Sequence, residues 1–385
     1  MTITRPKTKL AINRLRERRP LDAATIDRFL ARYEVPIVEG NRCTFLYRGA
    51  ADEVWVRHGV VGLPHQRLRR IPDTDLWSVT VELPAGSRVE YQIEIRSGEA
   101  WHRFNDPLNP RLARSPVGDS SVCYAAGYEV PDWTRYDPEA RPGQLIELTV
   151  QSQALRRDCK VVLYLPARYQ VASRYPLLVV HDGGDFLEYG SAKTVLDNLI
   201  HRLDVAELVA AFTFPGNRLV EYANHAPHAR FITSELVPRL EAELPLAAKP
   251  AGRCLLGSSF GAVAALSTAV RSPDTYGSLF LQSGSFVHTD IGEQHGGGPV
   301  FDPVVKFTNR YRERPIRVAD RIFQTCGVYE RLVVPNRSMV TTFREAGMDV
   351  RYVEARDGHN WENWRDRWRD GLSWIFPGPQ KFVYE

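Results

Sequence analysis

The sequence lacks the patterns that mark membrane proteins and disulfide-stabilised proteins. It contains no run of about 18 apolar residues, the length that a membrane-spanning helix needs. Its basic first 20 residues never reach an apolar run long enough for a signal peptide. The five cysteines are an odd set without CxxC spacing, which disfavours a disulfide framework and a cysteine-ligated zinc site. We therefore expect a protein of the reducing cytoplasm that does not enter a membrane.

A strong excess of one charge is also missing. The 50 basic and 46 acidic residues give a formal net charge of +4 in a mixed pattern, whereas a general nucleic-acid binder should present a strongly basic face. The hydrophobic fraction of 43% and the charged fraction of 25% are ordinary for a globular protein. We therefore expect no nucleic-acid partner. A small-molecule substrate fits this composition, an anionic one included, and the oligomeric state is left open.

Changes in the hydrophobic pattern divide the 385 residues into four segments. Residues 1–36 are predicted to be a basic, flexible or surface-bound arm with a short helix over 21–33. Residues 37–130 contain short alternating runs between turns, which predicts a small β-sandwich. The Pro-rich residues 131–143 are interpreted as a linker. In residues 144–385 strands alternate with helical patterns, which predicts an α/β fold with a mostly parallel central sheet.

Two features leave alternatives open. Trp55, Trp77 and Trp101 could form a platform for a carbohydrate, or they could fill the core and rim of the sandwich. Residues 283–315 form a long insertion with several basic side chains, which is interpreted either as a lid or as a disordered surface excursion.

A candidate nucleophile stands where a brief apolar run stops and a helix of small residues begins. Residues Gly257–Gly261 read Gly-Ser-Ser-Phe-Gly, the Gly-x-Ser-x-Gly pattern of a nucleophile elbow. In such an elbow a sharp turn from strand to helix lifts the serine hydroxyl above the sheet, and the glycines remove side chains that would collide there. The start of the helix carries partial positive charge that favours an oxyanion. Ser259 is therefore the candidate nucleophile, although the same pattern also occurs in ordinary turns.

A working elbow needs a base and an acid. The base takes the serine proton, and the acid fixes the tautomer of the base. In this fold both follow the serine in the chain, on loops after the last strands. Of the ten histidines only His359 occupies that place. Glu330, after the penultimate expected strand, is the preferred acid, with Asp349, Glu354 and Asp357 as alternatives.

Two backbone N–H groups should form the oxyanion hole. One belongs to the residue after the nucleophile, here Phe260, and the other to the loop after an earlier strand. That loop contains Gly183 and Gly184, whose missing side chains let the backbone approach a substrate. Gly183 is the preferred second donor, and Gly184 and Asp185 are expected to contact the substrate.

A second loop, residues 216–222, follows a strand at the carboxyl edge of the expected sheet, where open α/β sheets bind ligands. Arg218 could there meet an anionic substrate, or it could pair with Glu221. Tyr222 is expected to line the same pocket.

Four residues could in principle bind a metal: His181 and Asp182, and further along the chain His225 and His228. No third ligand has a convincing spacing, so we expect neither a metal nor another cofactor.

The motifs together resemble those of the enterochelin-esterase-like branch of the esterase D superfamily, from about residue 40 to the C-terminus. The first-domain matches are Pro-Asp-Thr-Asp-Leu-Trp and Asp-Pro-Leu-Asn-Pro-Arg. The later matches are His-Asp-Gly-Gly-Asp-Phe, Gly-Ser-Ser-Phe-Gly-Ala, Leu-Gln-Ser-Gly-Ser-Phe, Cys-Gly-Val-Tyr-Glu with Asn336-Arg337, and Asp-Gly-His-Asn-Trp-Glu-Asn-Trp-Arg. The resemblance implies an α/β-hydrolase fold preceded by an immunoglobulin-like, early-set β-sandwich. It also implies ester hydrolysis by Ser259, His359 and Glu330, which in the best-known members cleaves ferric catecholate siderophores.

We therefore expect a cofactor-free serine esterase that acts through an acyl-enzyme on a small-molecule ester, with an enterobactin-like ferric siderophore as a candidate substrate. Two rival functions are kept. The first is an acyltransferase that uses the same acyl-enzyme with an alcohol or sugar acceptor. The second is a glycan-binding module whose hydrolase domain is inert.

Overall fold

The computed structural model describes residues 9–288 and 298–379, and by its internal contacts the chain forms two compact units. The first unit holds the described residues up to Glu129 together with Arg356–Gly358. The second unit holds Val130–Ala355 and the described residues from His359 onward.

The first unit contains two antiparallel sheets. One has the strand order β1-β2-β6-β5, and the other has the order β4-β3-β7-β10-β9, with β8 paired to β7. The alternating patterns expected for a β-sandwich therefore do form strands. The strands are β1 (Ile37–Glu39), β2 (Arg42–Arg48), β3 (Glu53–His58), β4 (Gln66–Arg67), β5 (Arg69–Arg70), β6 (Leu76–Glu82), β7 (Arg88–Ser97), β8 (Ala100–Phe104), β9 (Leu112–Ala113) and β10 (Ser120–Tyr124).

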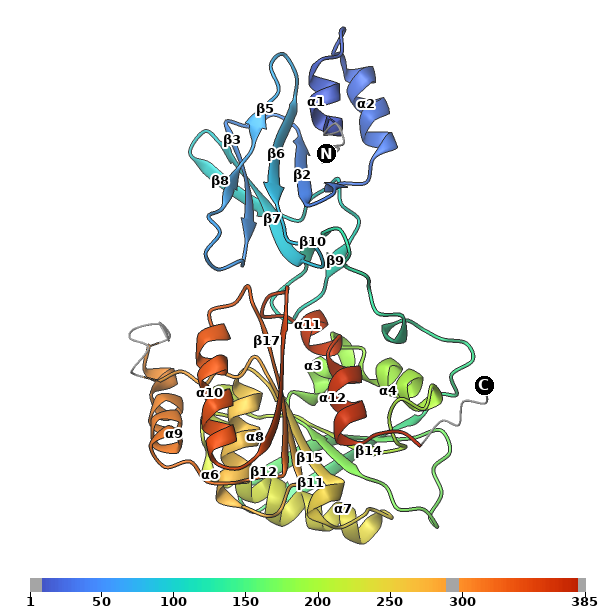
Figure 1. Cartoon of the computed structure of the whole chain (residues 1–385), viewed down its shortest axis with the longest axis vertical. Helices are drawn as coiled ribbons and strands as arrows, with labels where there is room; N and C mark the ends of the chain where they lie inside the picture. The colour runs from blue at the N-terminus through green and yellow to red at the C-terminus, as the bar shows by residue number, and fades with distance from the viewer. Residues whose placement is uncertain (1–8, 289–297, 380–385) are drawn as a thin grey trace, which may run out of the picture. The chain divides into compact units, whose positions relative to one another are not determined.

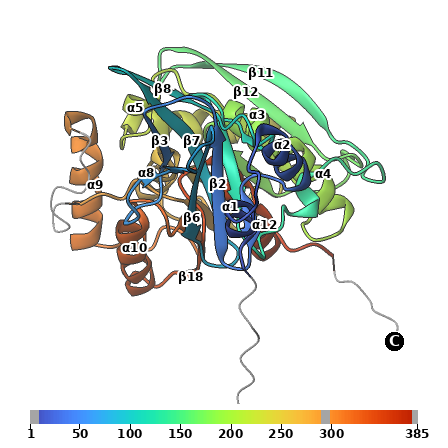
Figure 2. The same cartoon turned by 90° about the horizontal axis from the view of Figure 1, so that it is seen from above.

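Two helices precede these strands in the described part of the basic arm. Helix α2 (Ala23–Arg32) was expected, and the Asp22 side chain caps it by accepting the Thr25 N–H at 2.8 Å. Helix α1 (Ala11–Arg16) was not expected. It lies beside β2 in Figures 1 and 2 and buries Ala11, Ile12 and Leu15 in one hydrophobic cluster with residues of β2 and β6. This helix has only three buried apolar residues, and they stand among many arginines and lysines. The hydrophobic pattern of the segment is therefore weak in the sequence.

The three tryptophans of the first unit have different surroundings. Trp77 on β6 is buried, and its indole N–H donates to the Gly49 carbonyl at 3.1 Å. Trp55 on β3 is half-buried, while Trp101 on β8 is 48% exposed. Trp77 belongs to a different sheet from the other two. The core-and-rim alternative therefore describes Trp77.

The second unit is built on an eight-stranded sheet of order β11-β12-β14-β13-β15-β16-β17-β18. Strand β12 is antiparallel to both its neighbours, and the strands from β14 through β18 in this order run parallel. The strands are β11 (Gln144–Ser152), β12 (Arg157–Leu165), β13 (Leu177–Val180), β14 (Val209–Thr213), β15 (Arg253–Ser258), β16 (Ser278–Gln282), β17 (Arg321–Gly327) and β18 (Asp349–Ala355). This is the α/β-hydrolase fold that the resemblance implies.

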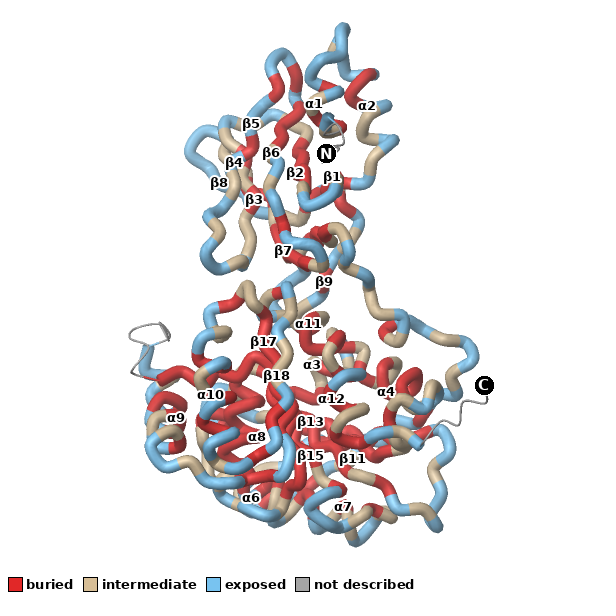
Figure 3. Tube along the Cα trace, in the orientation of Figure 1, coloured by how far each residue is buried: buried red, intermediate tan, exposed pale blue. Residues whose placement is uncertain are grey.

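Helices cover both faces of this sheet, and each face has its own hydrophobic cluster. One cluster includes side chains of α8, α9 and α10, and the other includes side chains of α3, α4 and α12. Figure 1 shows these two sets of helices on opposite sides of the sheet. The sheet between them is buried along most of its length (Figure 3). The helices are α3 (Gly183–Glu188), α4 (Ala192–His201), α5 (Arg218–Glu221), α6 (Ala226–Arg230), α7 (Val237–Glu243), α8 (Phe260–Arg271), α9 (Asp302–Glu313), α10 (Val333–Glu345), α11 (Trp361–Arg365) and α12 (Trp368–Ile375), with short helical turns η1 (Asp132–Thr134), η3 (Pro250–Gly252) and η5 (Gly298–Phe301).

Two stretches with a helical pattern are interrupted. Residues 229–244 contain a π-helical turn, η2 (Phe231–Leu236), between α6 and α7. Residues 361–375 are divided into α11 and α12. The second half of the insertion 283–315 is not a disordered excursion, because α9 buries Val304, Phe307 and Tyr311 in the core. Residues 289–297 lie outside the described residues.

The segment interpreted as a linker is attached to the second unit. The Asn198 side chain donates to the carbonyls of Trp133 and Arg135 at 2.8 and 2.7 Å. In the described ranges 9–288 and 298–379, no helix has the length and apolar character that crossing a membrane requires.

Candidate active site

Ser259 lies between β15 and α8 in a strained backbone conformation, with φ +56° and ψ −120°. A non-glycine residue adopts positive φ only when its surroundings impose it. The Ser259 N–H donates to the Gln282 carbonyl of the neighbouring strand at 2.9 Å, which fixes the turn. A Cβ at Gly257 would lie 2.1 Å from the Gly261 carbonyl oxygen, so the turn requires a glycine there. This is the elbow geometry that the sequence predicts.

The Ser259 hydroxyl has a partner that the sequence analysis did not foresee. Its Oγ lies 3.3 Å from Oγ of Ser285, and the Ser285 N–H donates to the Ser259 carbonyl at 3.1 Å. Ser285 is buried in the segment that follows β16. Ser285 belongs to the Leu-Gln-Ser-Gly-Ser-Phe motif, which supported the family resemblance but did not suggest a role for this serine.

The Glu330 carboxylate accepts a hydrogen bond of 2.6 Å from Nδ1 of His359. Its other oxygen accepts from the Ser283 hydroxyl and from the Gly327 N–H, each at 2.7 Å. Burial raises the pKa of this carboxyl, but the hydrogen bonds it accepts, above all from His359, outweigh burial and hold the pKa below its ordinary value. The carboxylate is therefore charged at neutral pH. Because Nδ1 donates to it, Nε2 of His359 is left to accept a proton.

The alternative acids have other partners. Glu354 accepts two hydrogen bonds from Arg337, at 2.5 and 2.7 Å, and Asp357 accepts the Gly358 N–H at 2.7 Å. Asp349 is exposed at the start of β18. Among the described residues, Glu330 is the acid that hydrogen-bonds His359.

Three parallel strands bring these residues to one edge of the sheet. Ser259 follows β15, Glu330 follows β17 and His359 follows β18. The carboxyl ends of parallel strands meet at the same edge, where open α/β sheets bind ligands. The His359 ring packs edge-on against Trp364 with 4.9 Å between centroids. The histidine is thus held by a hydrogen bond to Glu330 and by a ring contact with Trp364.

The two expected oxyanion donors stand at helix starts. Gly183 is the first residue of α3 and Phe260 the first of α8. The first N–H groups of a helix have no intrahelical partner and are available to a ligand. A Cβ at Gly183 would lie 2.5 Å from Cβ of Phe212, and one at Gly184 would lie 2.6 Å from the Phe214 ring. The loop therefore packs closely because both residues are glycines.

The expected pocket walls are only partly where the sequence placed them. Asp185 and Gly184 are half-buried in the first turn of α3. Burial, followed by the charge of Asp182, raises the pKa of the Asp185 carboxyl. Tyr222 has no exposed surface, and its hydroxyl accepts the Asp182 N–H at 3.0 Å, so it supports the loop from inside and does not line a pocket.

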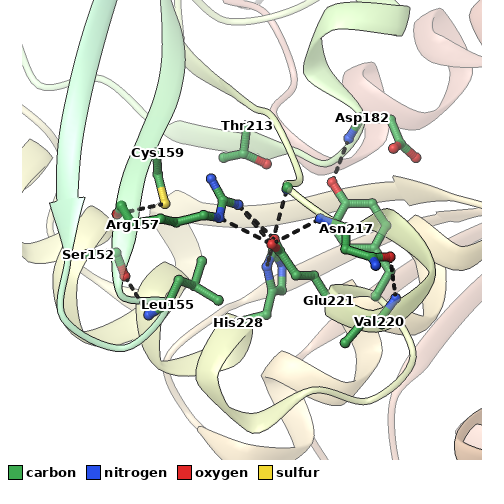
Figure 4. Close-up of polar contacts among 12 residues, drawn as sticks. Ser152, Leu155, Arg157, Cys159, Asp182, Thr213, Asn217, Val220, Glu221 and His228 are labelled. Atoms are coloured by element: carbon green, nitrogen blue, oxygen red, sulfur yellow. Dashed lines mark hydrogen bonds and ion pairs between the residues drawn. The ribbon is translucent and has the colours of Figure 1, made fainter.

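Arg218 does not pair with Glu221, the partner within the protein that the sequence suggested. It makes two hydrogen bonds of 2.7 Å to the Asp182 carboxylate. Glu221, the alternative partner, is held instead by Arg157 from the start of β12, as Figure 4 shows. Both pairings join segments that lie far apart in the sequence.

Of the candidate metal-binding residues, His181, Asp182 and His228 are buried, and His181 and Asp182 have partners within the protein. Nδ1 of His181 hydrogen-bonds the Leu256 carbonyl at 2.9 Å, and the His181 and His228 rings lie 5.3 Å apart between centroids, both buried. In the part of the chain that the structure describes, no group of three or more His, Cys, Asp or Glu residues could hold a metal ion.

The family model described as "Putative esterase" matches residues 152–375 of the chain. The chain is 23% identical over 352 residues to an iron(III) enterobactin esterase of Escherichia coli O6:H1, covering 83% of this chain and 85% of that protein. It is 24% identical over 408 residues to an iron(III) enterobactin esterase of Dickeya dadantii, covering 91% and 92%.

A crystal structure of a ferric enterobactin esterase from Salmonella typhimurium superposes with a TM-score of 0.71 at 21% identity, covering 87% of this chain and 93% of that one. That likeness is one of fold. Because the family model spans more than half of the sequence, the chain belongs to this esterase family, in its enterochelin-esterase-like branch.

Proposed function

We propose that the protein is a serine esterase that hydrolyses a carboxylic ester through an acyl-enzyme. The observation that carries this proposal is the meeting of a strained Ser259 elbow with a Glu330–His359 hydrogen bond at one sheet edge. Strain at a single residue is costly and persists mainly at functional sites. Membership of the esterase family supports the same reaction class.

Each residue has a defined part in the proposed reaction. Nε2 of His359 takes the proton of the Ser259 hydroxyl as Oγ attacks the ester carbonyl, and Glu330 stabilises the imidazolium that forms. The N–H groups of Phe260 and Gly183 stabilise the oxyanion of the tetrahedral intermediate. His359 then gives the proton to the leaving alcohol, and water attacks the acyl-enzyme by the same steps in reverse order.

One rearrangement is needed before attack. In the described residues the Ser259 hydroxyl meets Ser285, not His359. Such contacts between nucleophile and base are often long or absent without substrate and tighten in the complex. Rotation about the Ser259 side chain would exchange the Ser285 hydroxyl for the His359 ring.

The proposed substrate is a ferric siderophore ester of the enterobactin type. The two relatives named above are iron(III) enterobactin esterases, and the alignments extend over most of both chains. We propose that Gly184 and Asp185, beside the oxyanion loop, contact this substrate. Arg218 is already neutralised by Asp182, so we do not assign it to a substrate anion.

The test is hydrolysis of ferric enterobactin followed by mass spectrometry of the products, with wild type and Ser259→Ala in parallel. The proposal predicts linear fragments from wild type and none from the variant. A simple activated ester serves as a second substrate, so that a wrong siderophore assignment is separated from a wrong reaction class. Adding alcohol acceptors to the assay tests transfer: new esters in place of free acid would identify an acyltransferase.

A further inference from the structure

Arg218 and Asp182 form an ion pair with two hydrogen bonds. Nε of Arg218 donates to one carboxylate oxygen and Nη2 to the other, each over 2.7 Å. The Asp182 side chain is 1% exposed and that of Arg218 is 33% exposed. A two-point contact between guanidinium and carboxylate fixes the orientation of both groups. Arg218 is therefore committed to a carboxylate of the protein itself.

Asp182 directly precedes Gly183, the proposed second oxyanion donor. Its backbone is left-handed, with φ +54°, a conformation that its surroundings must enforce. The α5 segment and the residue after it hold Asp182 at two points: Arg218 binds the carboxylate, and the Tyr222 hydroxyl accepts the backbone N–H at 3.0 Å. The Tyr222 N–H donates to the Arg218 carbonyl at 3.0 Å, so both contacts come from one helical turn.

The same pair also touches the start of α8, which supplies the other proposed donor. The guanidinium carbon of Arg218 lies 6.0 Å from the centroid of the Phe260 ring. A Cβ added at Gly261 would lie 3.2 Å from an Asp182 carboxylate oxygen, so α8 and the carboxylate are close-packed. A shift of the pair would therefore move the N–H groups of Gly183 and Phe260 relative to each other.

Charge adds a second effect. An unpaired carboxylate one residue from the donor would oppose the negative charge that develops on the substrate oxygen, because a buried charge is poorly screened. The positive charge of the Arg218 guanidinium neutralises the negative charge of the Asp182 carboxylate by direct contact. The position of the two N–H donors and the neutral charge beside them thus depend on the same two side chains, Arg218 and Asp182.

We propose that Arg218 and Asp182 are positioning residues of the oxyanion hole. They act through Gly183 and Phe260 and do not bind the substrate. The inference depends on the proposed serine-esterase function and deepens it, because it assigns the support of the hole to an ion pair that the sequence pattern does not reveal.

The experiment compares Arg218→Lys with the matched control Arg157→Lys. Arg157 grips Glu221 in the same two-point manner, with Nη2 2.8 Å and Nε 3.2 Å from its oxygens, and Glu221 lies on the same α5 segment (Figure 4). Lysine keeps the charge in both variants but loses the two-point grip. The measurements are kcat and KM for a small uncharged ester and the rate of Ser259 labelling by a fluorophosphonate, on protein whose melting temperature has been checked.

We expect Arg218→Lys to lower kcat and the labelling rate by about 10- to 100-fold with KM little changed, since displacement of a positioning contact costs rate more than binding. Arg157→Lys should stay near wild type. Methylguanidinium added to Arg218→Ala should restore part of the lost kcat, because it replaces the missing group.

Wild-type kcat in Arg218→Lys would overturn the inference. So would a rise of KM confined to anionic esters, which would make Arg218 a substrate contact, or an equal loss in both lysine variants, which would make both pairs merely structural. A wild-type protein that the fluorophosphonate does not label would overturn the proposed function itself, and that result differs from all of these.

Discussion

Ser283 donates its hydroxyl hydrogen to Oε1 of Glu330 over 2.7 Å, while the same hydroxyl accepts the Trp364 indole N–H at 2.9 Å. Trp364 thus orients the Ser283 hydroxyl, and this hydroxyl in turn orients the Glu330 carboxylate. The second oxygen of the carboxylate accepts the hydrogen bond from His359. The orientation of the proposed base therefore depends on a buried serine that is not itself in contact with the histidine.

Ser283→Ala should lower both stability and rate. It removes one hydrogen bond to a buried carboxylate and leaves the Trp364 N–H without its acceptor, which should cost about 1–3 kcal/mol of unfolding free energy. We expect kcat to fall by about tenfold with KM unchanged, because Glu330 keeps its contact with His359 but gains freedom. Denaturant unfolding and steady-state kinetics check the two effects. An unchanged kcat in the destabilised variant would show that Ser283 serves the fold alone.

Glu330→Gln should cost about 10²- to 10⁴-fold in kcat, since an amide cannot stabilise the imidazolium and can favour the wrong tautomer. The matched control is Glu354→Gln, on the neighbouring strand, whose carboxylate is paired with Arg337. The control should remain within a few-fold of wild type. A comparable loss in both variants would argue against a special role of Glu330.

His228 should make stability depend on pH. Burial, followed by the charges of the neighbouring histidines, holds the pKa of His228 well below its ordinary value of 6.5, although a Glu221 oxygen lies 3.8 Å from Nδ1. Below pH 6.5 His228 binds a proton in the unfolded chain but stays neutral in the folded protein until a much lower pH. The free energy of unfolding therefore falls as the pH drops, by up to about 1.4 kcal/mol per pH unit for this group. His181, whose pKa burial also lowers, adds to the effect.

His228→Phe should flatten this dependence by about one proton, measured as the slope of unfolding free energy between pH 7 and about 5. The exposed His201→Phe is the reference substitution, measured in the same way. An unaltered slope in His228→Phe would mean that His228 is not the group responsible.

Helix α1 should contribute to the stability of the first unit. Ile12 is 1% exposed in a cluster with residues of β2 and β6, so Ile12→Ala should cost about 2–4 kcal/mol. The measurement is the urea midpoint followed by tryptophan fluorescence. The exposed Arg18→Ala is the reference. Equal midpoints would restore the interpretation of this segment as a loose arm.

Local patterns predicted the fold and the elbow well, because both depend on residues close in sequence. Alternating strands, the helical pattern of residues 21–33 and the Gly-x-Ser-x-Gly turn are short-range signals. Glu330 could be preferred among four acids but not chosen with certainty, because the choice depends on which loop faces His359.

The support of the site could not be predicted. Asp182 and Arg218 are 36 residues apart, and their pairing requires that the loops after β13 and β14 meet at the sheet edge. Ser283 and Ser285 belong to one short motif, and the sequence does not show that Ser283 contacts Glu330 and Ser285 contacts Ser259. Helix α9 was missed because its apolar residues lie within an insertion rich in basic side chains.

The most direct test of the central claim is intact mass spectrometry after treatment with a fluorophosphonate, on wild type and Ser259→Ala in parallel. An activated serine reacts with such a probe, whereas an ordinary surface serine does not. The account predicts a single adduct on wild type and none on the variant. A folded wild-type protein without an adduct, or an adduct that persists in Ser259→Ala, would contradict the assignment of Ser259 as the nucleophile.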